Sequence, residues 1–313
     1  MILHNIFFIF LLPLVAGVIL IPILIKFSKK TNFWVDVPEG DALKIHKKNI
    51  PLLGGLAMLV SSTLGVSIFG DQGFGIKLLG VFLGLLIVFS LGFWDDLKWK
   101  HISTTKPLLK FALLLVCTFV PSITLSWVGI GFDFIPVYGT SLFLGFVYIF
   151  LSINSVNYQD GMDGLAGGQV FISLVAFLWL GLLFNNIFAV IISLIFLGAV
   201  SAFLVFNFPP AKIFMGDSGA YSLGFILVVL AILFSKPYNI YSVLGPVFII
   251  GLPIFDGVFA NIRRLIAGKS IFLGDRSHFY DKLLQKGLST QKTLAICYFL
   301  QILLVLIGIG IYK

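Results

Sequence analysis

Charged residues are scarce in this sequence. Asp, Glu, Lys and Arg make up 11% of the 313 residues, whereas a soluble domain carries about 25%. Hydrophobic residues make up 59%, and the mean hydropathy is +1.10. These values exclude a soluble globular protein. They predict an all-α, polytopic integral membrane protein, because helices satisfy their own backbone hydrogen bonds in lipid.

Cysteine is also nearly absent. Cys117 and Cys297 both lie in apolar runs, so the sequence indicates neither a disulfide framework nor a metal cluster. The first apolar run, residues 5–27, lacks a small-residue cleavage site and is too long for a signal-peptide core. We therefore expect it to be retained as a span. Internal repeats, low-complexity segments and a soluble domain are lacking, which predicts a single domain over residues 1–313.

Apolar runs recur along the whole chain. A helix needs about 20 residues to cross the bilayer, and shorter runs are expected where helices end in a protein-lined cavity. We predict about ten transmembrane helices. Their approximate ranges are 5–27, 53–69, 76–94, 107–126, 140–153, 168–184, 187–206, 218–234, 243–262 and 292–312.

Positive charge orients these spans. All 21 Lys and Arg residues except Lys77, Lys236 and Lys313 lie in or beside the loops that follow the first, third, fifth, seventh and ninth predicted spans. Positive loops stay in the cytoplasm, so we expect both termini outside, in a bacterial-type cell membrane. The net charge of +8 then reflects these loops and not nucleic-acid binding. All 13 acids except Asp71 and Asp133 share that side, which predicts an active site facing the cytoplasm.

Two adjacent carboxylates, Asp95 and Asp96, close the third apolar run in GFWDDLK. They could simply be solvated at a helix end. However, acids at a helix C-terminus oppose the helix dipole, and paired carboxylates repel each other unless a cation is near. The pair therefore favours a divalent metal or a reacting proton.

Two further segments place polar groups between apolar runs. NSVNYQDGMDGLAGG carries Asn or Asp at every third position, with glycines that end a helix and let backbone approach a ligand. This composition suits Mg²⁺ or a phosphate-bearing ligand, although a polar connecting loop is the alternative. In NFPPAKIFMGDSG, Asp217 stands just before an apolar run. It is either an N-cap or a metal ligand, since Mg²⁺ takes one or two carboxylates plus phosphates and water.

Basic segments flank these motifs. Arg276 and His278 in DRSHFYDK are able to clamp diphosphate oxygens, and a patch for anionic lipids is the alternative. Lys44 and His46 in LKIHKKNIPLLGG are also candidates for holding phosphate. The preference for positive charge in the cytoplasm explains the lysines of that segment equally well.

Together these segments resemble the polyprenyl-phosphate N-acetylhexosamine-1-phosphate transferases, over about residues 44–289. LKIHKKNIPLLGG is similar to the family's Lys-x-His and Pro-x-x-Gly-Gly, and GFWDDL is similar to its Asp-Asp motif. NSVNYQDGMDGLAGG resembles Asn-x-x-Asn-x-x-Asp-Gly-x-Asp-Gly-Leu-Ala-x-Gly, and NFPPAKIFMGDSG resembles Asn-x-x-Pro-Ala followed by Met-Gly-Asp. The last two motifs are long and highly specific.

The resemblance implies an enzyme that transfers N-acetylhexosamine 1-phosphate, in the first instance N-acetylglucosamine 1-phosphate, from a UDP-sugar to polyprenyl (undecaprenyl) phosphate. UMP would be released, and the product would serve cell-envelope glycan synthesis. The resemblance also implies Mg²⁺ as cofactor, with Mn²⁺ as a substitute. It leaves open whether the chain forms a homodimer.

Individual residues take roles from the same resemblance. Asn157 and Asp217 would hold the metal against the UDP diphosphate, and Asp96 would support that arrangement. Asp95, the other catalytic residue, would orient or deprotonate the lipid phosphate, or act as a nucleophile. The expected substrate-binding residues are Lys44, His46, Lys106, Asn154, Asp160, Asp163, Asn207, Arg276 and His278.

One departure of this sequence from the family's motifs bears on the identity of the sugar substrate. Many bacterial relatives carry a His-x-His-His cluster in the last loop, where this chain has His278-Phe279-Tyr280-Asp281. The departure argues against the muramoyl-pentapeptide branch and for a branch that uses UDP-N-acetylglucosamine or a related UDP-sugar.

Two other classes of protein are alternatives. A secondary transporter also places acids among broken helices, but near the midplane and usually with repeated halves. A lipid phosphatase would need a more extensive Arg and His motif than a single Arg-x-His.

Overall fold

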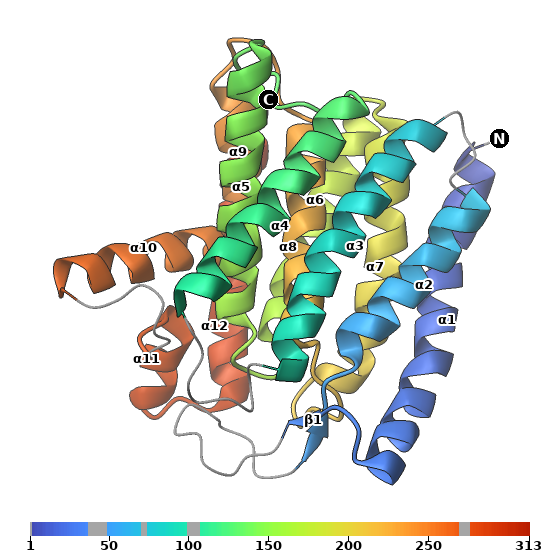
Figure 1. The fold of residues 1–313 in the computed structure, drawn as a ribbon, viewed down its shortest axis with the longest axis vertical. Coiled ribbons are helices and arrows are strands. Elements are labelled where there is room, and N and C mark those ends of the chain that lie inside the picture. Colours follow the sequence, from blue (N-terminus) through green and yellow to red (C-terminus); the bar gives the residue numbers. More distant parts are fainter. Residues whose placement is uncertain (1, 37–48, 70–73, 99–106, 269–275) are drawn as a thin grey trace.

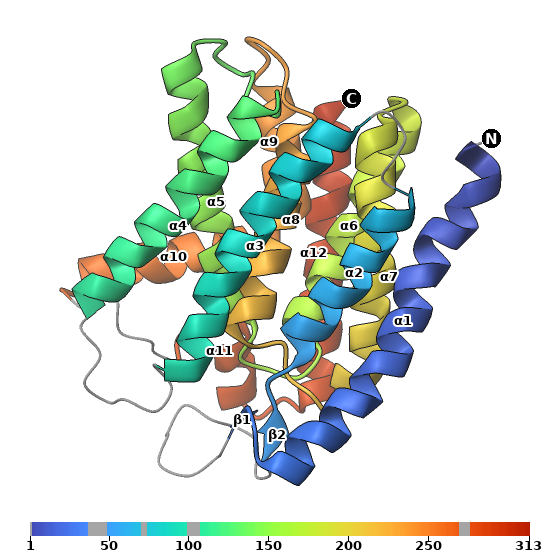
Figure 2. The ribbon, with the colours of Figure 1, turned by 45° about the vertical axis from the view of Figure 1, so that its right-hand side comes forward.

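The computed structural model describes residues 2–36, 49–69, 74–98, 107–268 and 276–313. Within these ranges the chain is a bundle of helices with one short antiparallel ladder, as Figures 1 and 2 show, which confirms the all-α prediction. The elements are α1 (Ile2–Thr31), β1 (Val35–Asp36), β2 (Ile50–Pro51), α2 (Gly54–Phe69), α3 (Gly75–Lys98), α4 (Pro107–Trp127), α5 (Tyr138–Gln159), α6 (Leu165–Leu183), α7 (Ile187–Asn207), α8 (Gly216–Ile232), α9 (Tyr241–Ile250), α10 (Leu252–Ile266), α11 (Phe279–Gln285) and α12 (Thr290–Tyr312).

Helix α8 forms the centre of the bundle. Every residue in it except Asp217 is buried, and it packs against α2, α3 and α5. A helix that is apolar on all sides belongs in the interior, which explains this position. By contrast, α1 and α12 expose large apolar side chains such as Phe8, Ile19 and Leu306, as expected for helices that face lipid.

Seven helices are long and apolar enough to cross a membrane, or eight if the bent pair α9 and α10 counts as one span; α2 and α8 are shorter apolar helices. Each predicted span overlaps one of these helices or the bent pair. Figures 1 and 2 show both termini at one end of the bundle, and β1 and α11 at the other. The total of ten spans and the cytoplasmic side of the α11 end remain predictions.

The predicted span over 243–262 is not one straight helix. It breaks at Gly251, which has a φ of 68°, and α10 turns by 89° from α9. The buried Gln301 of α12 bonds the backbone freed at the break: its Oε1 accepts from Leu252 N (2.8 Å), and its Nε2 donates to Ile249 O (2.9 Å). The break is stable because Gln301 supplies the hydrogen-bond partners that a helix end needs in an apolar interior.

The Pro-Leu-Leu-Gly-Gly segment joins the start of α2 to the start of α8. Phe214 N donates to Pro51 O (2.8 Å), and Gly54 N donates to Phe214 O (2.9 Å). The N–H of Gly55 reaches Met215 O at 3.0 Å. The segment that resembles the family's Pro-x-x-Gly-Gly motif therefore holds the Met-Gly-Asp turn in place.

Candidate functional site

Asp96 lies in the last turn of α3 and caps α8. Its Oδ1 accepts from the backbone N–H of Asp217 (2.9 Å), and its Oδ2 accepts from that of Ser218 (3.1 Å). A carboxylate is favoured at a helix N-terminus, which offsets the unfavourable placement of an acid at the end of its own helix. The turn before α8 needs Gly216, whose φ is 67° and whose missing Cβ would lie 2.5 Å from Asp96 Oδ2. Asp96 therefore positions the metal-binding candidate Asp217.

Asp95 is buried beside Asp96 and pairs with a cation. Lys110 of α4 forms an ion pair with Asp95 Oδ2, and the Lys110 side chain is 41% exposed. The Tyr221 hydroxyl of α8 donates to the same oxygen at 3.5 Å. Asp95 also lies close enough to Asp217 for their carboxyl groups to interact. The described part of the site thus places the Lys110 ammonium group among several acids.

The predicted metal ligands lie together. Asn157, in the last turn of α5, donates its Nδ2 to Asp217 Oδ1 at 2.8 Å. That bond leaves the amide oxygen of Asn157 for another partner. Among the described residues no group of three or more His, Cys, Asp or Glu side chains forms a metal cluster. The donor set of one amide and one carboxylate still fits Mg²⁺, which takes its other oxygens from phosphates and water.

Two of the predicted substrate-binding residues brace the loops around the site. Asn207 accepts from Gly164 N (2.9 Å) and donates to Ile213 O (2.8 Å). Asp163 accepts from Ala211 N at 2.9 Å. These bonds tie the Asp-Gly-x-Asp-Gly loop to the Pro-Pro-Ala loop, so both side chains hold backbone in the structure.

Asn154 and Asp160 are the remaining residues of the Asn and Asp motif. Asn154 donates to Phe150 O of its own helix at 2.7 Å. Asp160, the residue after α5, is partly buried at the start of the loop. The structure therefore brings Asn157 to Asp217 but leaves Asn154 one turn further back in α5.

The last loop lies against this motif. The His278 ring is 5.2 Å from the Tyr158 ring, and Tyr280 packs so closely on Gly161 that a Cβ there would overlap its hydroxyl. Burial raises the pKa of Tyr280 above its usual range, so its phenol stays protonated at neutral pH. Arg276 is partly buried at the start of the same segment. Lys44, His46 and Lys106 lie outside the described residues.

Residues 78–235, which include α8 and most of α3, match the family described as glycosyl transferase family 4. The chain belongs to glycosyl transferase family 4. The probable undecaprenyl-phosphate N-acetylglucosaminyl 1-phosphate transferase of Bacillus subtilis (strain 168) is 31% identical over 92% of this chain and 80% of its own length. The family match, together with the alignment of this relative over 92% of the chain, supports a transferase over a transporter.

Other relatives carry a different name. The phospho-N-acetylmuramoyl-pentapeptide-transferase of Wolbachia pipientis wMel is 34% identical over 77% of this chain and 78% of its own length. The enzyme of the same name from Thermoanaerobacter sp. (strain X514) is 31% identical over 88% of this chain and 87% of its own. The percentage identity to these relatives alone therefore does not identify the sugar substrate.

Two residues at this candidate site were not identified from the sequence. Lys110 lies within the predicted span 107–126 and was counted only as a loop charge. Asp256 lies within the predicted span 243–262, and its carboxylate accepts from His278 Nδ1 at 2.8 Å. The signal was available, because an ionisable residue inside an apolar span indicates a functional site.

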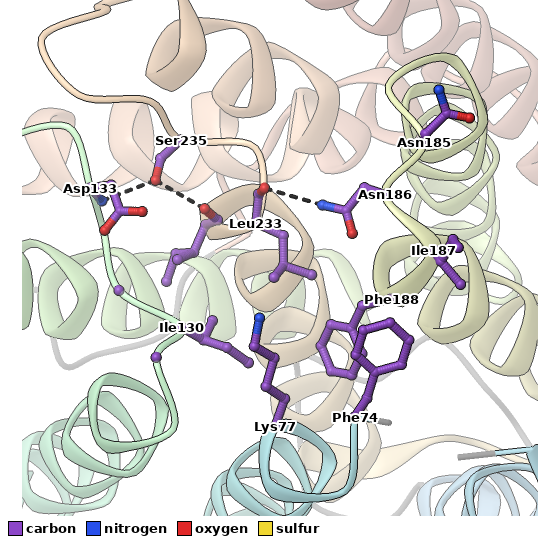
Figure 3. A pocket seen from close by; sticks show the side chains of 13 residues that line it. Phe74, Lys77, Ile130, Asp133, Asn185, Asn186, Ile187, Phe188, Leu233 and Ser235 are labelled. Atoms are coloured by element: carbon purple, nitrogen blue, oxygen red, sulfur yellow. Dashed lines mark hydrogen bonds between the residues drawn. The ribbon is translucent and has the colours of Figure 1, made fainter. Parts of the chain in front are cut away.

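A separate cavity of 430 Å³ lies at the opposite end of the bundle. Figure 3 shows Lys77 pointing into it, with Asp133 on one side and Phe74 and Phe188 on the other. Lys77 and Asp95 stand near opposite ends of α3, about 27 Å apart at the helical rise. The cavity is therefore not part of the carboxylate site.

Close packing at Gly92 gives a first testable prediction. A Cβ at Gly92 would lie 2.5 Å from Ser218 Cα and 2.6 Å from the Asp217 carbonyl carbon, so Gly92→Ala must separate α3 from the start of α8. We expect a loss of about 1–3 kcal/mol of stability, measured as a lower melting temperature in detergent, together with lower activity. Gly310→Ala in α12 is the control, since a Cβ there meets nothing within 4 Å. Equal melting temperatures for the two variants would contradict this account of the packing.

Proposed function

We propose that this chain transfers N-acetylhexosamine 1-phosphate from a UDP-sugar to polyprenyl phosphate. The observation that carries the proposal is the contact between Asn157, Asp217 and Asp96, which come from three separate motifs. An oxygen of the lipid phosphate forms a bond to the sugar-linked phosphorus of the UDP-sugar. The bond from that phosphorus to the bridging oxygen breaks, and UMP leaves with that oxygen. The name of the Bacillus subtilis relative supports this reaction.

Asn157 and Asp217 would hold Mg²⁺ at the diphosphate. When bound, the ion neutralises phosphate charge and stabilises the leaving UMP. The protein side chains then need chiefly to hold the two phosphates in line, since positioning and electrostatics supply most of the rate in phosphoryl transfer. Asp96 contributes by fixing the backbone of Asp217.

Asp95 and Lys110 would receive the lipid phosphate. The Lys110 ammonium is partly exposed beside a buried carboxylate, so it can bind a phosphate oxygen while Asp95 fixes its position. Lipid phosphate is already largely ionised near neutral pH, and a base is therefore not required. A cytoplasmic position of this end of the bundle would let UDP-sugar arrive from water while the polyprenyl chain stays in the membrane.

The test is turnover by the detergent-solubilised protein. With Mg²⁺, undecaprenyl phosphate and UDP-N-acetylglucosamine, we expect UMP and lipid-linked sugar diphosphate in equal amounts. We expect no UMP when the lipid is omitted or when a chelator removes Mg²⁺. A transporter would release no UMP under any of these conditions, and that result would refute the proposal.

A panel of UDP-sugars tests the substrate. We propose that N-acetylglucosamine is transferred and N-acetylmuramoyl-pentapeptide is not, because Tyr280 and Asp281 stand where the resemblance leads one to expect the second and third histidines of the cluster. Product identification by mass spectrometry would decide between them. Transfer of the muramoyl-pentapeptide would place the chain with the Wolbachia and Thermoanaerobacter relatives instead.

A further inference from the structure

The buried carboxylate of Asp256 binds three donors at once. Oδ2 accepts from Gln159 Nε2 (2.8 Å) and from His278 Nδ1 (2.8 Å), and Oδ1 accepts from Phe279 N (2.9 Å). Asp256 is 8% exposed and lies in the first turns of α10, just past the break at Gly251. One side chain therefore connects α5, α10 and the segment that begins α11.

These bonds determine the protonation pattern of the His278 ring. A carboxylate only accepts, so the nitrogen that faces it must carry a proton, and that nitrogen is Nδ1. The ring is also held by Tyr158, at 5.2 Å, and by Tyr280, stacked at 6.1 Å between centroids. Only Nε2, on the far side of the imidazole from Asp256, is left for another ligand.

Gln159 connects this pair to the motif loop. It is the last residue of α5, directly before Asp160, and its Oε1 accepts from the buried Gln169 of α6 at 3.3 Å. Its amide orientation is thereby set, with Nε2 directed at Asp256. The position of His278 is consequently coupled to the start of the Asp-Gly-x-Asp-Gly loop.

We propose that Asp256 is a positioning residue that keeps the proton of His278 on Nδ1 and presents Nε2 to the UDP-sugar. With the proton on Nδ1, the unprotonated Nε2 accepts from a sugar or ribose hydroxyl of that substrate. A buried acid that orients a histidine in this way acts through tautomer and geometry. The assignment rests on the proposed function.

Asp256→Asn tests the assignment with almost no change of shape. The amide offers one oxygen and one NH₂ to donors on both sides. If its oxygen keeps the bond from Phe279 N, the NH₂ faces His278 Nδ1, which must then give up its proton, and it also faces Gln159 Nε2, whose bond to this position is lost. We expect kcat to fall by about 10–100-fold, the usual effect of losing such an orienting partner. The rate would be measured as UMP release.

NMR of ¹⁵N-histidine-labelled protein reads the tautomer directly. The chain has four histidines, and the His278 signals are those that disappear in His278→Gln. That variant keeps an NH₂ donor toward Asp256 and should remain folded. We expect a proton on Nδ1 of His278 in the parent protein and its transfer to Nε2 in Asp256→Asn. A neutral parent ring protonated on Nε2 would overturn the assignment, even if Asp256→Asn does not fold.

A double-mutant cycle separates positioning from general stabilisation. If Asp256 acts through His278, then Asp256→Asn should cost little further kcat in the His278→Gln background. Costs that multiply would show that Asp256 acts independently, and the proposal would be wrong. If the parent turns over no UDP-sugar, the proposed reaction fails, yet the NMR result still decides whether Asp256 sets the tautomer.

Discussion

Asp217→Asn should lower UMP release by about 10²–10³-fold, the cost of losing one electrostatic partner of a reacting phosphate. The substituted amide keeps an oxygen for Asn157 Nδ2, and its backbone N–H still donates to Asp96, so the fold should be retained. What is lost is the negative charge that holds the cation. Initial rates measured against Mg²⁺ concentration should show a higher half-saturating concentration.

Asp96→Asn provides the contrasting variant. Both oxygens of Asp96 accept from backbone N–H groups of α8, and an amide would turn an NH₂ toward one of them. We expect a loss of about 1 kcal/mol, typical of a removed helix cap, and therefore a lower melting temperature, which Asp217→Asn should not show. Asp133→Asn, at the far cavity, should retain parental rates. An unchanged rate and Mg²⁺ dependence in Asp217→Asn would remove Asp217 from the metal site.

Asp95→Asn should lower kcat by about 10²–10⁴-fold, the range for a side chain that acts on the reacting group. The buried carboxylate pairs with Lys110 and accepts from Tyr221, so its neutralisation leaves the ammonium without its charge partner. If positioning of Lys110 is the role, then Lys110→Met should cost a similar factor and the double variant little more. Near-parental turnover in Asp95→Asn would exclude Asp95 from the mechanism.

Isotope exchange distinguishes a nucleophile from a positioning group. A nucleophilic Asp95 would form an acyl phosphate and release UMP before the lipid binds. Labelled UMP would then exchange into UDP-sugar without any polyprenyl phosphate. With Asp95 as a positioning group, we expect no exchange until the lipid is added.

The apolar runs and motif boundaries were readable from sequence because they depend on local composition. Each predicted span corresponds to a helix or to the bent pair, and the long Asn and Asp motif ends α5 where its glycines begin. The break at Gly251 was not anticipated, since the N–H of the following residue, Leu252, is satisfied by Gln301, 49 residues further along the chain. Helix α11 was likewise expected only as a loop.

The individual roles at the site were harder to predict, because a side chain's partners can be distant in sequence. Asn207 and Asp163 look like ligand-binding residues in their motifs but bond to backbone in the folded chain. Lys110 and Asp256 stand in apolar runs, and nothing local indicates that they face Asp95 and His278. The predicted roles of Lys44, His46 and Lys106 remain predictions.

Composition and motif spacing by themselves determined that this chain is a helical membrane protein with acids and amides at the ends of its helices. The reason is that burial in lipid selects long apolar runs and excludes charge from them. Only the tertiary structure decided which acid caps a helix, which pairs with a cation and which orients a histidine. Those roles depend on contacts across as many as 122 residues, and such contacts exist only once α3, α5, α8 and α10 have packed together.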